Sequence, residues 1–134
     1  MKIVHALALG LFLSSTTTMA ECVSPDAPEL PSGADSTMDD MLGGQKMVKT
    51  YQAANIEYMK CLEAIISEAD AAIAQGTEEE QAAAHATHSE ATESYNAAVS
   101  AEESVAGQFN TEIRAYKAAN PGYQTVGLSW RRKQ

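Results

Sequence analysis

The chain has 134 residues, which is enough for one small domain. It carries 18 acidic and 9 basic side chains, giving a formal net charge of −9. Because a strongly acidic surface repels nucleic acid and anionic membranes, we expect no nucleic-acid partner. The charge also serves solubility, so it does not by itself identify a function.

Residues 1–20 are typical of a secretory signal peptide. Lys2 supplies the positive charge, and the apolar run over residues 3–13 is too short to span a bilayer. Thr18-Met19-Ala20 fits a small-x-small cleavage site, so we expect cleavage after Ala20 and a periplasmic or secreted protein. Loss of Lys2 leaves 8 basic against 18 acidic residues, a net charge of −10. We predict no stable membrane insertion, because no later run approaches roughly 18 apolar residues.

Residues 21–35 are predicted to form an extended, proline-rich arm that contains the first of two cysteines. Cys22 has three possible states: a lipid anchor, a free or intermolecular thiol, or a disulfide with Cys61. Lipidation is disfavoured, because Glu21 stands where a lipoprotein signal requires a small residue. The extended arm reaches about 43 Å, and Cys61 lies about 38 Å along a helix starting near Ser36. The Cys22–Cys61 disulfide is therefore geometrically possible, and it is our prediction.

Residues 36–120 contain no proline, and their apolar side chains recur every three or four positions. This pattern predicts two long helices, at about 37–75 and 78–119. Asn120-Pro121-Gly122 ends the second helix, and residues 121–134 form a C-terminal tail. The expected fold class is therefore all-α: a long, coiled-coil-like antiparallel αα-hairpin with the N-terminal arm joined to it by the disulfide.

Capping signals mark both helix starts and the turn between the helices. Ser36 and Asp39 have the spacing of a capping box at the start of the first helix. Thr77 and Glu80 have the same spacing at the start of the second. Gly76 stands between the helices, and we expect it to adopt the left-handed conformation common past a helix end.

A fold at this turn pairs positions whose numbers add to about 153. Val48 then faces Val105, and Gly44 faces Phe109. The missing side chain of Gly44 would leave room for the phenyl ring, or the glycine would mark a local break in the helix. Both interpretations are open at this point.

The first helix has more large apolar residues than one partner helix and a short arm can cover. They are predicted to form an interaction face that binds a second copy, giving a homo-oligomer, or another protein. The residues of this face are Met47, Ile56, Met59, Ile66 and Ile73.

The sequence shows no arrangement typical of an enzyme: no nucleophile with a base, and no glycine-rich phosphate loop. We therefore predict a protein that is not an enzyme and binds no cofactor. The expected function is that of a structural or interaction protein of the cell envelope, such as an adaptor, a chaperone-like holder or an assembly subunit.

Binding of a metal or small ligand is the alternative function. His85 and His88 are one helical turn apart, but a metal site needs three or four ligands, and no carboxylate has the spacing to complete it. Methionine thioethers of the first helix are soft ligands for copper(I). At helical spacing, however, methionines are more typical of core and interface positions.

The tail carries the only tryptophan, Trp130, followed by the cations Arg131, Arg132 and Lys133. One interpretation is that its apolar residues fold back on the hairpin while the basic end meets acidic helix faces. The other is a short linear motif that binds a partner or an anionic surface.

Three motifs lie within residues 22–64: Leu30-Pro31-Ser32-Gly33-Ala34, Val48-Lys49-Thr50-Tyr51 and Tyr58-Met59-Lys60-Cys61-Leu62. In these, the chain resembles small exported helical proteins of proteobacteria that share L-P-x-G-A, V-K-x-Y and Y-x-x-C-L. The resemblance implies export and a disulfide. That group has no assigned activity, so the resemblance implies no catalytic residue.

Overall fold

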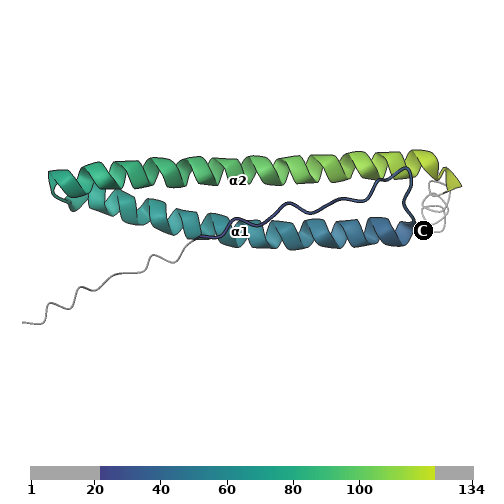
Figure 1. Ribbon diagram of the computed structural model, residues 1–134, viewed down its shortest axis with the longest axis horizontal. Coiled ribbons are helices and arrows are strands. Elements are labelled where there is room, and N and C mark those ends of the chain that lie inside the picture. The colour runs from purple at the N-terminus through teal and green to yellow at the C-terminus, as the bar shows by residue number, and fades with distance from the viewer. Residues whose placement is uncertain (1–21, 123–134) are drawn as a thin grey trace, which may run out of the picture.

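The computed structural model describes residues 22–122, which form an antiparallel hairpin of two long helices. Helix α1 spans Met38–Gln75 and helix α2 spans Glu78–Ala119. The helices lie side by side, joined at one end, here called the tip, and separate at the other, the base (Figure 1). No strand is present in the described part of the chain. The predicted all-α hairpin is confirmed.

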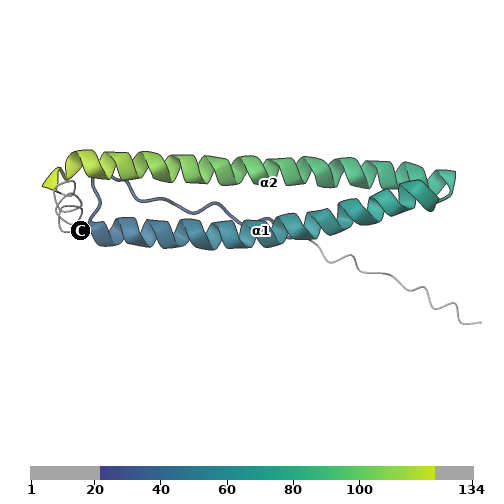
Figure 2. The ribbon, with the colours of Figure 1, turned by 180° about the vertical axis from the view of Figure 1, so that it is seen from behind.

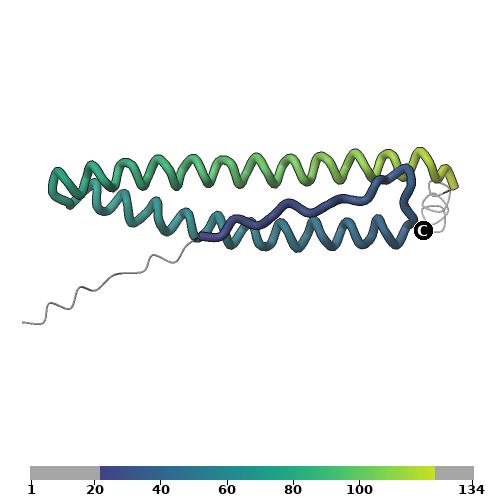
Figure 3. The backbone as a smooth tube through the Cα atoms, in the orientation of Figure 1, coloured from purple at the N-terminus to yellow at the C-terminus, as the bar shows by residue number. Residues whose placement is uncertain are grey.

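Residues 22–36, here called the N-terminal segment, form neither helix nor strand. The segment begins near the middle of the hairpin and runs to the base, where α1 starts in the opposite direction (Figure 3). Its first residue, Cys22, forms a disulfide with Cys61, which lies 39 positions later in the sequence, and the two Cα atoms are 5.8 Å apart. The disulfide prediction is confirmed, and it excludes the free-thiol and lipid alternatives for Cys22.

The cap of α1 differs from the prediction by one residue. Thr37, rather than Ser36, is the N-cap: its hydroxyl accepts from the Asp40 amide at 3.3 Å, and Asp40 Oδ2 accepts from the Thr37 amide at 2.8 Å. Both Ser36 and Thr37 have an aspartate three positions later, so spacing alone does not distinguish them. Ser36 is half-buried behind a hydrogen-bonded turn, whereas Thr37 stands exposed at the helix boundary.

The expectation of a left-handed Gly76 is wrong. Gly76 has φ −78° and ψ 169°, and Thr77 has nearly the same extended conformation, so the chain reverses through two extended residues. The Gly76 amide still closes α1 by donating to the Ala72 carbonyl at 2.8 Å. Glycine is favoured here by space, because a Cβ would lie 2.6 Å from that same oxygen. Thr77 and Glu80 form the predicted capping box of α2.

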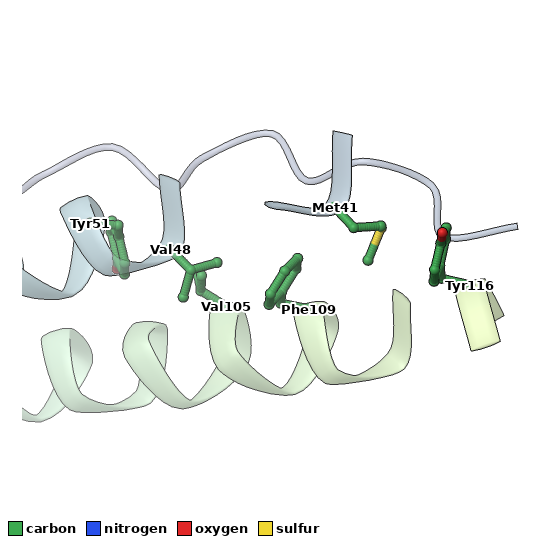
Figure 4. Close-up of a cluster of buried hydrophobic side chains, with 6 residues drawn as sticks. All are labelled: Met41, Val48, Tyr51, Val105, Phe109 and Tyr116. Carbon is green, nitrogen blue, oxygen red and sulfur yellow. The ribbon is translucent and has the colours of Figure 1, made fainter. Parts of the chain in front are cut away.

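The main hydrophobic core lies in the base half of the hairpin. Val48 faces Val105, and Phe109 lies between Val48 and Met41 (Figure 4). Leu30 of the N-terminal segment and Ile113 pack against this cluster. The buried core residues of the cluster are Met41, Val48, Tyr51, Val105, Phe109 and Tyr116.

Two glycines allow the N-terminal segment to approach the helices closely. Gly33 lies directly on α2: an added Cβ would overlap the Glu112 carbonyl oxygen, and the Gly33 amide donates to Glu112 Oε2 at 2.7 Å. A Cβ on Gly44 would lie 2.8 Å from Pro31 Cδ and 2.9 Å from Phe109 Cε2. Helix α1 is continuous through Gly44, so the glycine makes room for a ring and does not break the helix.

Candidate functional site: the two sides of the hairpin

The two-helix layer has two sides with different surroundings. Figure 1 shows the N-terminal segment in front of the helices, and Figure 2, from behind, shows the helices in front of the segment. We call the covered side the segment side and the other the open side. The apolar seam between the helices separates these two sides. A residue of either helix therefore belongs to the segment side or to the open side according to the flank of the seam on which it lies.

Small side chains of α2 make room for the N-terminal segment. A cavity of about 310 Å³ lies where the segment crosses the helices. From α2 it is lined by Ser94, Ala97 and Ala101, and from α1 by Tyr51 and Tyr58. The small alanine and serine side chains of α2 leave room here for an extended chain to lie close against the groove between the helices.

Met47 also lies on the segment side. It lines a groove of about 400 Å³ together with Pro25 and Pro28 of the N-terminal segment. It precedes Cys61 by 14 residues, which is two heptads, so both side chains point to the same flank of α1. The disulfide at Cys61 therefore places the segment over this flank.

A polar cluster stands in the middle of the apolar seam. Asn55 is 1% exposed, and its Nδ2 donates to the Ala98 carbonyl at 3.0 Å and to Glu102 Oε2 at 3.1 Å. Gln52 Nε2 donates to the other oxygen of Glu102 at 3.4 Å. Burial raises the pKa of Tyr51, and the charge of Glu102 raises it further. Asn55 and Ala98 add to 153, so this buried bond fixes the predicted register, as polar seam residues do in coiled coils.

The open side carries most of the large apolar side chains that are exposed. Leu42 is 55% exposed, Ile56 43%, Met38 37% and Val99 38%. Met38, Leu42 and Ile56 are on α1, where they belong to a stripe of residues that recur every three or four positions. This stripe lies on the flank of the seam opposite Cys61. This stripe, here called the open-side stripe, consists of Met38, Leu42, Gln45, Lys49, Gln52, Ile56, Met59, Glu63, Ile66, Asp70 and Ile73.

Polar pairs join the two helices along the open side. Tyr95 donates to the Glu63 carboxylate, which raises the pKa of the tyrosine hydroxyl. Nearer the tip, His88 Nε2 lies 3.4 Å from Asp70 Oδ1. Along the open side, apolar side chains are therefore interspersed with polar and charged ones.

The structure divides the predicted interaction face between the two sides. Ile56, Met59, Ile66 and Ile73 share the open-side stripe, with Ile56 exposed and the other three half-buried. Met47, 41% exposed, lies apart from them beside the N-terminal segment. The five residues therefore do not form one surface.

The histidines do not meet further ligands. His85 is exposed, and His88 has one carboxylate neighbour, Asp70. Within residues 22–122, no group of three or more His, Cys, Asp or Glu side chains is placed to hold a metal ion. The Asp70 carboxylate comes from the facing helix, which spacing along α2 alone does not reveal.

Two predicted features lie outside the described residues. One is the tail motif of Trp130, Arg131 and Arg132, and the other is the leader with cleavage after Ala20.

Neither described helix is long and apolar enough to cross a membrane. Comparisons with protein families, with curated proteins and with solved structures found no match.

Sequence reasoning missed two exposed residues of the open side, Leu42 and Val99, and the contact of Gly33 with α2. Leu42 follows Met38 by four residues and precedes Ile56 by two heptads, which was a usable signal. Val99 stands next to a buried alanine of the seam and was not distinguishable from a core residue. The Gly33 contact joins residues 79 positions apart, and no local pattern indicates it.

Proposed function

We propose that the chain is an exported, non-enzymatic interaction protein that binds a protein partner through the open side of its hairpin. The single observation that supports this is the exposure of Ile56, 43%, in a stripe that also carries Met59, Ile66 and Ile73. A side chain on the outer flank of a two-helix layer gains burial only from something that covers that layer.

The energetics favour an occupied surface. Complete burial of one such side chain contributes roughly 1.5–3 kcal/mol, so several together offset an association cost of about 4–15 kcal/mol. The carboxylates of Glu63 and Asp70 interrupt the apolar residues of the stripe. They favour a partner with cations at matching positions, because charge complementarity selects among apolar partners.

The compartment is part of the same proposal. The Cys22–Cys61 disulfide is typical of an oxidising environment, such as the periplasm or the extracellular space. We infer that residues 1–20 act as the signal peptide and that the helices pack as a coiled coil, with the proline-rich arm as a third element. The buried Asn55 in the seam supports the coiled-coil interpretation.

Replacement of Ile56 and Met59 together with glutamate tests the interaction surface. We expect helicity by circular dichroism to be unchanged, and association to be lost in analytical ultracentrifugation and in capture of partners from an envelope extract. The matched control is Ala53→Glu, which adds a charge at an exposed α1 position outside the stripe. Equal loss in the control, or a wild type that stays monomeric and captures no partner, would contradict the proposal.

A further inference from the structure

We propose that the segment side of the hairpin is a binding groove for polyproline II segments, which the N-terminal segment occupies in cis until the Cys22–Cys61 disulfide is opened. The ligand is a segment of a partner protein that has a proline at every third position and a large apolar residue where this chain has Ala27. The proposal goes beyond the interaction function, because it concerns the opposite side of the hairpin and a different class of ligand. It rests on the burial pattern of the segment, on its contacts with the helices and on the space that it leaves unfilled.

The N-terminal segment turns every third residue toward the helices. The residues between these positions are exposed, apart from Leu30, which packs against the aromatic core. A polyproline II helix has three residues per turn, so this is the burial pattern of such a helix with one face against the hairpin. The half-buried residues of this face are Cys22, Pro25, Pro28 and Pro31.

The length of the segment fits the same conformation. Cys22 is bonded to Cys61, and Pro31 lies against Gly44, nearer the base (Figure 3). The nine steps from Cys22 to Pro31 span about 28 Å in polyproline II. The seventeen helical steps from Gly44 to Cys61 span about 26 Å. The two lengths agree, so the segment follows α1 in this extended form.

The first helix offers a contact position to each proline. Tyr58, Tyr51 and Gly44 follow one another at intervals of seven residues along α1. Pro25 lines a cavity with both tyrosines, and Pro28 lines the neighbouring groove with Tyr51. One turn of polyproline II rises about 9 Å, and seven helical residues rise about 10.5 Å. The prolines and their contact positions therefore stay nearly in step, and grooves lined by aromatic residues recognise proline-rich segments in this way.

The N-terminal segment leaves part of this groove unfilled. The cavity of about 310 Å³ is lined from the segment by Ser24, Pro25 and Ala27. Ser24 and Ala27 have small side chains and are exposed. Atoms that line an empty space forgo contacts, so a larger apolar side chain in place of Ala27 gains burial there. A partner segment with such a residue fits the groove better than the segment that it displaces.

The disulfide determines which segment the groove holds. While Cys22 and Cys61 are bonded, the N-terminal segment is present at an effective concentration far above that of a free partner. A dithiol opens the bond by thiol–disulfide exchange: its first thiolate forms a mixed disulfide with one cysteine, and its second thiolate then displaces that cysteine. The dithiol is oxidised to a disulfide, and its two electrons and two protons pass to Cys22 and Cys61. Non-covalent contacts alone then hold the segment, and a better-fitting segment replaces it.

Binding of a labelled peptide to the full-length chain tests the proposal. The probe is a fluorescein-labelled peptide of residues 23–35 that carries Ala27→Leu. In fluorescence polarisation we expect saturable binding to wild type reduced with dithiothreitol and to the variant with Cys22→Ser and Cys61→Ser. Oxidised wild type should not bind at the same concentrations. The control peptide has the same composition with positions 27 and 28 exchanged, which breaks the spacing of the prolines, and it should bind several-fold more weakly.

A third variant separates this groove from the open side. Ile56→Glu combined with Met59→Glu should leave the affinity for the peptide unchanged, so failure of this inference is distinct from failure of the interaction function. Dimerisation of this variant on reduction would assign the groove to the N-terminal segment of a second copy and overturn the choice of partner. Three other outcomes would overturn the groove itself: equal binding of the two peptides, equal binding to oxidised and reduced wild type, or no binding to an open chain that keeps its helicity.

A second measurement does not depend on the fold of the cysteine-free chain. The equilibrium between the Cys22–Cys61 disulfide and dithiothreitol gives the effective concentration of one cysteine at the other. Ala27→Leu should raise this concentration several-fold, and Pro25→Gly combined with Pro28→Gly should lower it several-fold. The matched control places the same two glycines at exposed positions of the segment, and it should have a smaller effect. Equal losses in the two glycine pairs would contradict recognition through the prolines. The control variant is Asp26→Gly combined with Glu29→Gly.

Discussion

The base and tip halves of the hairpin use the same two helices but are held together differently. In the base half, Tyr51, Phe109 and Tyr116 fill the seam, and the N-terminal segment adds a third layer. In the tip half, Leu62 is buried next to the disulfide, and the buried residues beyond it are the alanines Ala69, Ala84 and Ala91. The disulfide at Cys61 lies near the boundary between the halves. The difference indicates that the base is the stable unit and the tip an extension supported by local interactions.

Stability is therefore expected to be uneven along the hairpin. Regions with little buried apolar area open with lower free energies than a packed core does. The tip relies on the Thr77 capping box, the His88–Asp70 pair and alanine packing. The base combines an aromatic core, a covalent link and the contact of Gly33 with α2. Mutations in the two halves should therefore have effects of different size.

The largest expected effect is loss of the disulfide. In the chain-entropy model, a link across 39 positions stabilises the fold by about 4 kcal/mol. Replacing Cys22 and Cys61 together with serine should lower the free energy of unfolding by this amount in denaturant titration. Amide exchange should accelerate mainly in the base, where the segment detaches. An equal acceleration at the tip would contradict the division of the molecule into two halves.

Truncation of the aromatic core should have the next largest effect. Phe109→Ala removes a ring that is 7% exposed between Met41 and Val48, at a cost of about 3 kcal/mol. The matched change at the tip is Ala84→Gly, also at a buried seam position, which costs about 1 kcal/mol through helix propensity. Thermal unfolding should separate the two variants clearly. Similar losses would mean that the tip packs as tightly as the base.

Two glycine substitutions should have smaller effects of opposite sign. Gly33→Ala forces the N-terminal segment away from the Glu112 carbonyl, and we expect a loss of about 2 kcal/mol from overpacking. Gly43→Ala meets no atom within 4 Å on an exposed helical position, so it should stabilise the fold by about 1 kcal/mol. Chemical denaturation of both variants measures the contrast. Stabilisation by both would show that the segment does not press on α2.

The helices, the position of their turn and the seam register were predictable because each depends on local spacing, and the disulfide because the chain holds only two cysteines and the arm between them is long enough. Caps and apolar periodicity are encoded within a few residues, and the register follows from where the chain turns. The Asn55–Ala98 bond and the Gly44–Phe109 contact agree with that register.

What could not be predicted depends on long-range geometry. Periodicity shows that α1 has a wide apolar face, but not which flank the N-terminal segment covers. For this reason Met47 was grouped with Ile56, although the segment lies beside only the former. Two equally spaced caps at Ser36 and Thr37 likewise differ only through the turn that precedes them.

The smallest expected effect is a pH dependence of the two capping boxes. One starts α1 at the base and the other starts α2 at the tip, so the same motif can be compared in both halves. Hydrogen bonds from Thr77 lower the pKa of Glu80 below its ordinary 4.5, and those from Thr37 lower that of Asp40 below 3.8. A carboxylate whose folded pKa is lowered stabilises the fold above its unfolded pKa, and this contribution is lost as pH falls through the folded value.

Acid should therefore weaken both caps, but with visible consequences mainly at the tip, because the aromatic core and the segment hold the start of α1. Amide exchange from about pH 6 to about pH 3, corrected for intrinsic rates, should show selective loss of protection near Thr77. Glu80→Gln keeps an acceptor at the capping position and does not titrate, so the dependence due to this cap should disappear. If the Thr37 cap opens as readily as the Thr77 cap in acid, the base does not protect its own helix end, and the contrast between the halves is limited to their cores.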